Sequence, residues 1–468
     1  MSAEPVSRRA RAHRRRSRSF VAGVLAVVGV LAVFGVAGAA VTVIQGPRVT
    51  SVQVDPEAAT TTSGSRMIVT TTQSLAEVDP SQITITPATP FAVDTSGRSV
   101  GVRFTLPLYD DTEYTVTIDD VEGIGGGPTA SVTETFRTPP LQTYLLQRGD
   151  DEDVIARTDL EGTGSAVFRH PHIEDFRATT THLVISVQGE DGTSDLLVTD
   201  LDGENLREIA LPDVGYVSNL QSADRGDLIG FTFSDRDLGA DGGRESRLYT
   251  ASARGTDPVA APVEVTGADP RVAAWRFVPD TDSILMISFD GTLLLTGSGG
   301  DGATALGSAL DIEGIARGSS VAVVERVEGL VEIDLTDASE SPLDEPDPDL
   351  GGATTVTPLP DGSTIRTGAV LEDGAPTGRT AVSLVGVDGG ATELAEIAAT
   401  DAVLQTCVSP SARYLAVMVA PDAVDNRYDT YGLPLPERVE TRVIEIADGA
   451  EAVALIGSSV AWCQTPRA

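Results

Sequence analysis

The sequence predicts an all-β protein that follows a single N-terminal membrane helix: first a β-sandwich, then a seven-bladed β-propeller. Three observations lead to this fold class. A strand-and-turn stretch recurs seven times between residues 155 and 449, residues 49–138 form short strands of alternating polarity, and residues 20–44 contain no charged side chain. The chain of 468 residues is too long for one ordinary core, so several domains are expected.

The recurring stretch is clearest at residues 196–203, where an apolar run leads into Asp202-Gly203, a strong turn signal. Its copies are about 48 residues apart, and a period in this range made of short strands is typical of a propeller. The seven copies are residues 155–162, 197–203, 248–255, 293–300, 331–337, 384–390 and 443–449.

Each repeat is expected to contain strands A, B, C and D, with the recurring stretch forming strand C and the turn after it. The first repeat begins at Tyr144 with a B strand and lacks an A strand. Residues 459–464 supply one, because Trp462 precedes Pro466 by the same spacing that separates Trp275 from a proline in an A strand. The two ends of the propeller, residues 141–468, should therefore close one ring.

The two cysteines have matching positions in this register. Cys407 lies three residues before Pro410 and Cys463 three residues before Pro466, so both are expected on neighbouring innermost strands. In an oxidising exterior such a pair predicts a disulfide. Two buried free thiols are the alternative.

The turns between strands A and B suggest a family. Residues 408–416, 277–287 and 359–365 contain Ser-Pro-Ser, Pro-Asp and Pro-Asp-Gly turns followed by an apolar strand. They resemble the S-P-D-G-x-x-L-A turn of TolB-like propellers. This resemblance covers about residues 141–468 and implies a fold, but no ligand.

Residues 49–138 are predicted to be all-β, with alternating strands at 66–71, 82–86, 99–104 and 113–118. Residues 106–118 resemble the L-x-x-x-T-x-Y-T-V-x-V strand of bacterial SbsA-type Ig-like domains. The resemblance implies an Ig-like β-sandwich that acts as a spacer or a surface-binding module.

Residues 20–44 are long enough to cross a bilayer as a helix. Residues 1–19 contain seven Arg, so the positive-inside rule predicts a cytoplasmic N-terminal tail, a short linker at 45–48 and an extracytoplasmic remainder. The alternative is a signal peptide cleaved at Ala37-Gly38-Ala39.

Composition excludes several functions. Lys is absent, which rules out a lysine nucleophile, a Schiff base and a P-loop. Beyond residue 19 the chain carries 26 Arg against 68 acidic residues. Such a charge repels nucleic acid, so no nucleic-acid partner is expected.

Few residues suggest chemistry, and the sequence predicts no catalytic residue and no cofactor. Asp235, Asp237 and Asp241 form a glycine-rich acidic loop that fits a calcium loop poorly and a solvated hairpin loop better. His170 and His172 lack an acidic ligand at a fixed spacing, which disfavours zinc. Residues 150–153 are interpreted as a polar connection.

A longer insertion, residues 421–438, is predicted between strands B and C of the seventh blade. It contains Tyr428, Tyr431, Leu433 and Leu435, an apolar and aromatic group in a loop. This composition suits contact with a partner. The alternative is that the group packs on its own blade.

Two functions from different classes fit these features. The first is a single-pass, membrane-anchored, extracytoplasmic binding or scaffolding protein of the bacterial cell envelope, whose partner is a protein or a cell-wall polymer. The second is an envelope hydrolase or lyase with a carboxylate site in the propeller channel. The sequence contains no nucleophile motif, which favours binding.

Overall fold

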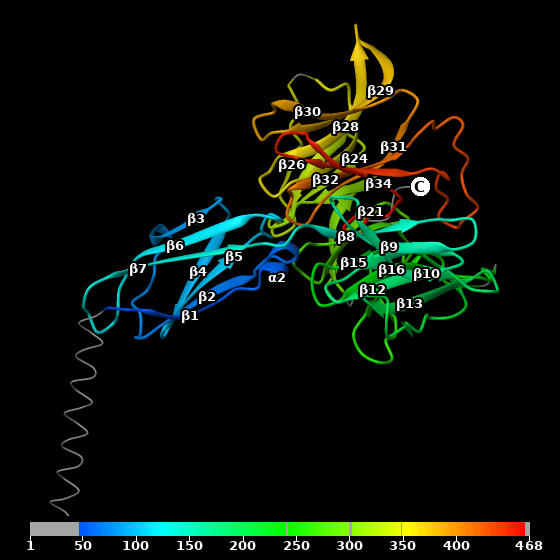
Figure 1. The fold of residues 1–468 in the computed structure, drawn as a ribbon. Coiled ribbons are helices and arrows are strands. Elements are labelled where there is room, and N and C mark those ends of the chain that lie inside the picture. The colour runs from blue at the N-terminus through cyan, green and yellow to red at the C-terminus, as the bar shows by residue number, and fades with distance from the viewer. Residues whose placement is uncertain (1–45, 240–241, 299–301, 348, 464–468) are drawn as a thin grey trace, which may run out of the picture. The chain divides into compact units, whose positions relative to one another are not determined.

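The computed structural model describes residues 46–239, 242–298, 302–347 and 349–463 (Figure 1). These residues divide into two compact units. Unit 1 comprises residues 46–55, 65–104 and 113–136, and unit 2 comprises residues 56–64, 105–112 and everything from 137 onward. Two short segments inside the predicted sandwich range, 56–64 and 105–112, therefore belong to unit 2. We call them the cap segments.

Unit 1 contains two antiparallel sheets, with strand orders β1-β2-β5-β4 and β3-β6-β7. The short 3₁₀-helix η1 (Pro80–Gln82) precedes β3. The strands are β1 (Val49–Gln53), β2 (Arg66–Thr71), β3 (Ile83–Thr86), β4 (Phe91–Ser96), β5 (Ser99–Phe104), β6 (Glu113–Val121) and β7 (Ala130–Arg137).

The alternation in the sequence has a direct structural cause in unit 1, because each sheet buries only one face. In β3 the side chains of Ile83 and Ile85 are buried and the two threonines are exposed. The two sheets face each other, since Phe104 of β5 packs against Phe136 of β7 at 6.2 Å between ring centroids. The four strands predicted from alternation are present.

One part of the all-β prediction is wrong. Residues Pro56–Thr61 form a short helix, α2, in the first cap segment. The sequence Asp55-Pro56-Glu57 has the pattern of a helix start, with an acidic residue, then proline at the first position and another acid in the first turn. The all-β prediction relied on the alternating strands that follow and did not take this helix-start pattern into account.

Unit 2 contains seven successive sheets in a propeller-like arrangement. Six have four antiparallel strands in chain order, and the first has three, in the order β10-β9-β8. The strands of the first four sheets are β8 (Gln142–Gln147), β9 (Asp153–Asp159), β10 (Gly164–His170); β11 (Ile173–Ala178), β12 (His182–Gln188), β13 (Ser194–Asp200), β14 (Arg207–Glu208); β15 (Gly215–Ser222), β16 (Leu228–Asp235), β17 (Arg247–Ser252), β18 (Ala261–Pro262); β19 (Val272–Phe277), β20 (Ser283–Ser288), β21 (Thr292–Gly297) and β22 (Thr304–Ser308).

The last three sheets repeat this order. Their strands are β23 (Asp311–Ile315), β24 (Val321–Arg326), β25 (Gly329–Asp334), β26 (Glu340–Pro342); β27 (Ala353–Pro358), β28 (Thr364–Glu372), β29 (Ala375–Val385), β30 (Ala391–Ile397); β31 (Ala402–Val408), β32 (Tyr414–Ala420), β33 (Glu440–Glu445) and β34 (Glu451–Ile456). The recurring stretch of the sequence is the third strand and the turn after it in six sheets, as predicted, and in the three-stranded first sheet it is the middle strand, β9.

The core of unit 2 lies between successive sheets. Second strands are buried on both faces, so they are continuously apolar: β12 has five consecutive buried residues and β32 is buried throughout. Apolar side chains of neighbouring sheets meet in these layers, as Val184 and Leu196 of the second sheet do with Phe231 of the third. Each sheet depends on its neighbours for burial, which is the physical basis of a repeat fold.

One glycine of the recurring turn is required by a close approach. Gly203 has a φ of 81°, and a Cβ at this position would collide with the carbonyl oxygen of Val167 in the first sheet. The Asp-Gly turn of the second sheet therefore lies directly against its neighbour, which only glycine permits.

The A strands share a distortion. In all six of β11, β15, β19, β23, β27 and β31 the pairing with the second strand shifts register, near the start in five strands and between Ser218 and Gln221 in β15. Such bulges turn a side chain out of the regular alternation. In β11 the bulged residue is Glu174, which lies between Ile173 and Asp175.

The chain end completes the first sheet. Leu146 of β8 exchanges two backbone hydrogen bonds of 2.8 Å with Ser458, and the amide of Ala461 donates to the carbonyl of Tyr144. The predicted pairing of residues 459–464 with the Tyr144 strand is thus confirmed only in part: Ala461 bonds to Tyr144, but the bridge to Leu146 is made by Ser458 and residues 459–463 form no strand. Gln464 lies outside the described residues. Side chains of the first and seventh sheets, including Leu145 and Val443, pack together and close the ring.

The predicted disulfide between Cys407 and Cys463 is present, with 5.5 Å between the Cα atoms. It joins β31, the A strand of the seventh sheet, to the C-terminal segment that completes the first. Ring closure is therefore covalent as well as non-covalent.

The cap segments contact the turns between strands A and B of unit 2. Arg225 in the third sheet donates to the carbonyl of Ser63 at 2.7 Å, and the Ser411 hydroxyl in the seventh donates to Asp110 at 2.9 Å. Gly318 in the fifth sheet also packs against the second cap segment. Since these turns belong to three different sheets, the cap segments extend across the A–B end of the ring.

The membrane prediction concerns residues that the structure does not describe: the tail 1–19, the span 20–44 with Ala37-Gly38-Ala39, and residue 45. Among the described residues, no helix is both long enough and apolar enough to cross a bilayer.

Replacing Cys407 and Cys463 with serine should lower the free energy of unfolding of unit 2 by about 4 kcal/mol, because the bond closes a loop of 56 residues and so restricts the unfolded chain. Urea unfolding of the parent and the double variant, each with and without reductant, measures this. Reductant should affect only the parent. Two thiols that titrate in unfolded, unreduced parent protein would contradict the bond.

A second prediction concerns Asp110, whose burial raises the pKa of its carboxyl from 3.8 to about 6, although the hydrogen bond from Ser411 acts in the opposite direction. The folded chain disfavours the ionised form. The free energy of unfolding should therefore fall by about 3 kcal/mol as pH rises from about 4 to about 6, and this change should be absent from Asp110→Asn. Urea unfolding at pH 4.5, 5.5 and 7 measures the difference.

Asp111→Asn is the matched control, because Asp111 is a neighbouring, exposed carboxylate paired with exposed Arg137. It should change stability by less than about 1 kcal/mol. Parallel pH profiles for the parent and Asp110→Asn would contradict the role assigned to Asp110.

Candidate functional site

The loop 421–438 connects β32 to β33, between strands B and C of the seventh sheet, as predicted. Buried Asn426 ties its base together, with its amide donating to the carbonyls of Pro421 and Arg438 and its oxygen accepting from the Arg438 amide. Beyond this base, backbone hydrogen bonds pair Asp429 with Leu435 and Arg427 with Glu437. Residues 427–437 thus form a small ordered hairpin, which we call the strap.

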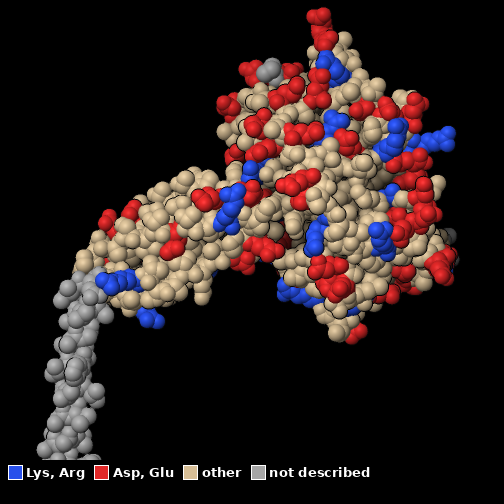
Figure 2. Space-filling view, viewed as in Figure 1, with Lys and Arg blue, Asp and Glu red and all other residues tan. Residues whose placement is uncertain are grey.

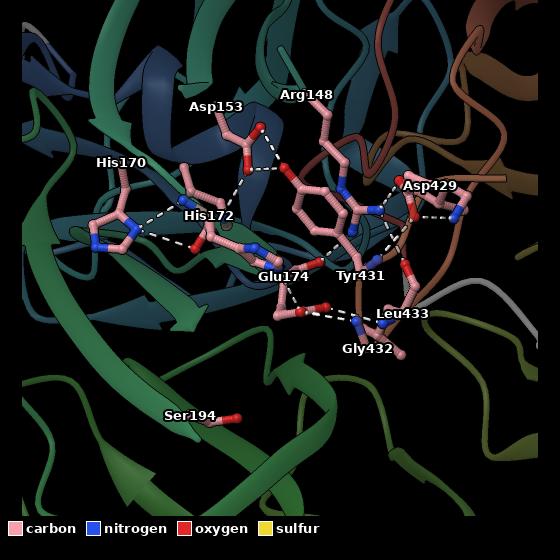
Figure 3. Close-up of polar contacts among 12 residues, drawn as sticks. Arg148, Asp153, His170, His172, Glu174, Ser194, Asp429, Tyr431, Gly432 and Leu433 are labelled. Atoms are coloured by element: carbon pink, nitrogen blue, oxygen red, sulfur yellow. Dashed lines mark hydrogen bonds and ion pairs between the residues drawn. The ribbon is translucent and has the colours of Figure 1, made fainter. Parts of the chain in front are cut away.

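Tyr431 of the strap makes the most contacts outside its own sheet. Its hydroxyl lies 2.9 Å from both carboxylate oxygens of Asp153 in the first sheet, to which it donates (Figure 3). The Arg148 guanidinium carbon lies 4.0 Å from the centre of its ring, and the His172 ring stacks on it at 3.8 Å between centroids. Burial, and then the hydrogen bond to Asp153, raise the pKa of Tyr431 above its usual value, so the phenol stays a donor.

Asp153 is held in place by the backbone of the first two sheets. It is fully buried at the start of β9 and accepts hydrogen bonds from the amides of Gly149 at 3.1 Å and Ile173 at 2.6 Å. The interpretation of residues 150–153 as a solvated polar connection is therefore wrong for Asp153. Its side chain turns inward because its oxygens serve amide groups that are buried beside it.

Glu174 holds the backbone of the strap. Its two carboxylate oxygens accept from the amides of Gly432 and Leu433, each at 2.9 Å, and Oε1 also lies 2.7 Å from His172 Nε2. As the bulged residue of β11, Glu174 leaves the regular alternation of the A strand and points toward the strap (Figure 3). Hydrogen bonds to a carboxylate are among the stronger ones in proteins.

Arg148 connects all three sheets involved. One guanidinium nitrogen lies 2.5 Å from Asp429 and 3.0 Å from the carbonyl of Leu433, and the other donates to the carbonyl of Glu174 at 2.9 Å. The side chains of Arg148 and Asp429 are each 13 % exposed, so the ion pair is largely removed from water. Asp429 in turn accepts from the amides of Tyr431 and Leu435.

The four residues predicted to contact a partner therefore differ in their surroundings. Tyr431 is bound within the chain, and Leu433 and Leu435 are half-buried with their backbone groups bonded. Tyr428 is 60 % exposed. The group does not pack on its own sheet alone, since Tyr431 and Leu433 dock on the first two sheets.

Sequence reasoning did not identify Arg148, Asp153, His172 and Glu174 as one cluster. A signal for part of it was present in His172 and Glu174, which stand two residues apart at the start of an A strand. His172 was weighed only together with His170, as a zinc pair, and Glu174 was not included. Among the described residues, no group of three or more His, Cys, Asp or Glu side chains is arranged to hold a metal ion.

The acidic loop considered for calcium is arranged around an arginine. Both oxygens of Asp235 bind Arg244, whose backbone amide also donates to Asp235 at 2.6 Å. The Asp237 side chain is 95 % exposed, and Asp241 lies outside the described residues.

Carboxylates on the A strands also have partners within the chain. Asp175 of β11 pairs with Arg177 at 2.7 Å, and both side chains are almost fully buried. Glu313 of β23 accepts a hydrogen bond from the amide of Val356 in the next A strand. These carboxylates join strands of the ring.

Exposed apolar side chains of unit 2 concentrate at one end of the ring. In a sheet of four antiparallel strands, B–C and D–A connections emerge at one end, and A–B and C–D connections at the other. Among the described residues of unit 2, ten large exposed apolar side chains lie on or next to B–C and D–A connections, and four lie at the other end, three on C–D connections and one in the second cap segment. The ten are Val214, Tyr216, Leu238, Phe289, Leu310, Val327, Leu371, Val424, Tyr428 and Ile456, and the four are Leu206, Val259, Val387 and Tyr109.

The surroundings of these apolar side chains are acidic. The D–A connection between β26 and β27 contains Asp344, Glu345, Asp347 and Asp349 and no basic residue. Asp and Glu side chains also cover much of the visible surface of unit 2, with isolated Arg between them (Figure 2).

Comparisons with known proteins provide no family. No protein-family model matches the chain, and no curated protein matches it. The solved structures that resemble it include a structural genomics protein of unknown function from Bacteroides thetaiotaomicron, at 11 % identity and TM-score 0.36 over 79 % of this chain and 94 % of that one, and an oligogalacturonate lyase in complex with manganese, at 10 % identity and TM-score 0.42 over 70 % of this chain and 93 % of that one. At such values neither likeness carries an argument about function, which has to come from the residues of this chain.

Tyr431→Phe should lower the free energy of unfolding by about 1.5–3 kcal/mol, because it removes a hydrogen bond to the buried Asp153 carboxylate and leaves the ring contacts in place. Tyr428→Phe, in the same strap but exposed, should change it by less than about 0.5 kcal/mol. Urea unfolding measures both. Equal effects of the two substitutions would show that the strap is not anchored through Tyr431.

Proposed function

We propose that this protein is a membrane-anchored, extracytoplasmic binding or scaffolding protein of the bacterial cell envelope, without catalysis. In this proposal, residues 20–44 anchor it, residues 45–48 are a linker, unit 1 is an Ig-like spacer, and unit 2 is a TolB-like, seven-bladed propeller that presents the binding surface. The partner is a protein or a cell-wall polymer.

The observation that carries the proposal is the unequal distribution of exposed apolar side chains between the two ends of unit 2. Single exposed apolar residues are ordinary on protein surfaces, but their concentration on one set of connections is typical of contact surfaces. The opposite, A–B end is where the cap segments lie. A partner therefore has its access at the B–C and D–A end.

The runner-up is an envelope hydrolase or lyase with carboxylates in the propeller channel. Asp175 and Glu313 are the A-strand carboxylates whose bonds are described above, and each is bonded within the ring. A carboxylate that serves as acid, base or nucleophile must reach its substrate. The pairing of these two groups favours the binding function.

The test uses a photo-crosslinking amino acid placed at single positions in the protein in intact cells. Position 428 lies at the proposed binding end, and position 387, also an exposed apolar residue, lies on a C–D connection as the matched control. Position 428 should give a discrete crosslinked species and position 387 should not.

Equal crosslinking from the two positions would contradict the proposal, as would turnover of purified envelope glycans or peptides by the isolated protein. In the latter case Asp175→Asn and Glu313→Gln would show whether the A-strand carboxylates carry the reaction.

A further inference from the structure

The docking of the strap has the features of peptide recognition. Three consecutive residues of the strap, Tyr431, Gly432 and Leu433, are contacted through side chain and backbone together. The phenol is bound by Asp153, both following amides by Glu174, and the Leu433 carbonyl by Arg148. We call the receiving residues Arg148, Asp153, His172 and Glu174 the receptacle.

Two residues of the receptacle, Asp153 and His172, are positioned by the first two sheets without help from the strap, whereas Arg148 and Glu174 are also bonded to strap groups. Asp153 is fixed by two amides of these sheets, and His172 is fixed by Glu174 and by its own amide, which donates to His170 Nδ1 at 3.1 Å. The strap has its own internal bonds through Asn426 and Asp429. Two parts that are each held separately meet here, as a binding site and its ligand do.

Near Tyr431 the strap buries little further surface, and its one buried residue beyond this part is Pro436. Gly432 and Pro434 are exposed, and the flanking leucines are only half-buried. A Cβ at position 432 would lie 3.4 Å from the Glu174 carboxylate, so the receptacle accepts a small residue after the tyrosine. The recognised segment is therefore short: a phenol, a small residue and a bent backbone, since residues 430–433 form a bend.

We propose that the receptacle is a peptide-binding site that its own strap occupies, and that it also accepts, from a partner, a bent segment with a tyrosine followed by glycine or another small residue. This inference rests on the proposed binding function and names its partner class as a polypeptide. The partner segment displaces Tyr431 from Asp153 and takes over the two amide bonds to Glu174.

The strap competes with a free peptide for the receptacle, and this competition lowers the peptide affinity that an experiment measures for the parent protein. A tethered ligand has an effective concentration in the millimolar range, so the strap opposes any free peptide of equal affinity. Removing the Tyr431 side chain vacates the place of the phenol beside Asp153 and weakens the hold of the strap on the rest of the receptacle. A peptide should therefore bind a Tyr431→Gly variant at least tenfold more tightly than the parent.

The probe is a labelled synthetic peptide, Asp-Thr-Tyr-Gly-Leu-Pro-Leu-Pro, which copies residues 429–436. Fluorescence anisotropy measures its binding to the full-length chain as parent, as Tyr431→Gly, and as Tyr431→Gly combined with Glu174→Gln. Saturable binding is expected for the single variant, with at least a tenfold loss in the double variant. A peptide with Phe in place of Tyr should bind at least tenfold more weakly.

The inference is overturned if the folded Tyr431→Gly variant does not bind the peptide, or if Glu174→Gln makes no difference. Tyr431→Phe serves if the glycine variant does not fold, because it keeps the ring and loses only the bond to Asp153. The peptide should then bind it more tightly than the parent, and equal binding would overturn the inference. Crosslinking from position 428 without any peptide binding would reject the receptacle and leave the proposed binding function in place.

Discussion

Ring closure is the constraint on which unit 2 depends. Every sheet buries both faces of its middle strands against its neighbours, so a sheet with an open side would leave an apolar face in water. The first sheet is also one strand short, and residues 458–461 fill that place with a few backbone hydrogen bonds. So few bonds are a weak closure for a ring of this size, and the structure adds two further connections.

The disulfide is the first of these connections and the strap is the second. Cys463 is tied to β31 near the A strands, and the strap spans from the seventh sheet to the first and second at the B–C end. The disulfide and the strap therefore connect the first and seventh sheets at different places. Together with the packing of Leu145 and Val443, they join the first and last sheets by covalent, polar and apolar interactions.

The docking of the strap also explains why side chains of the types found in catalytic centres have a structural role here. A tyrosine, a histidine, an arginine and three carboxylates that converge in one place would suggest a catalytic centre, yet each carboxylate here is bonded to amides, a phenol or a guanidinium of the chain itself. Buried polar groups are costly unless they are bonded, so such a network is stable only when it is complete. A site that is complete within one chain is also one that a chemically similar partner can enter by exchange, which links ring closure to binding.

The sequence by itself determined the parts of this protein that depend on local pattern. The strand order, the seven repeats, the return of the chain end to the first sheet at Ala461 and the disulfide at Cys407 all follow from alternation, turn residues and register, which neighbours along the chain encode. The local pattern Asp55-Pro56-Glu57 encodes helix α2 in the same way, although the all-β prediction missed it.

Tertiary structure alone decided the receptacle. Tyr431 is 278 residues from Asp153, and Gly432 is 258 residues from Glu174, so no local pattern relates them. Glu174 reaches the strap because a bulge removes it from the alternation, and the burial of Asp153 becomes visible only once Ile173 lies beside it. Local sequence fixes which strands form and in what order, but the contacts between distant loops depend on how the closed ring brings them together.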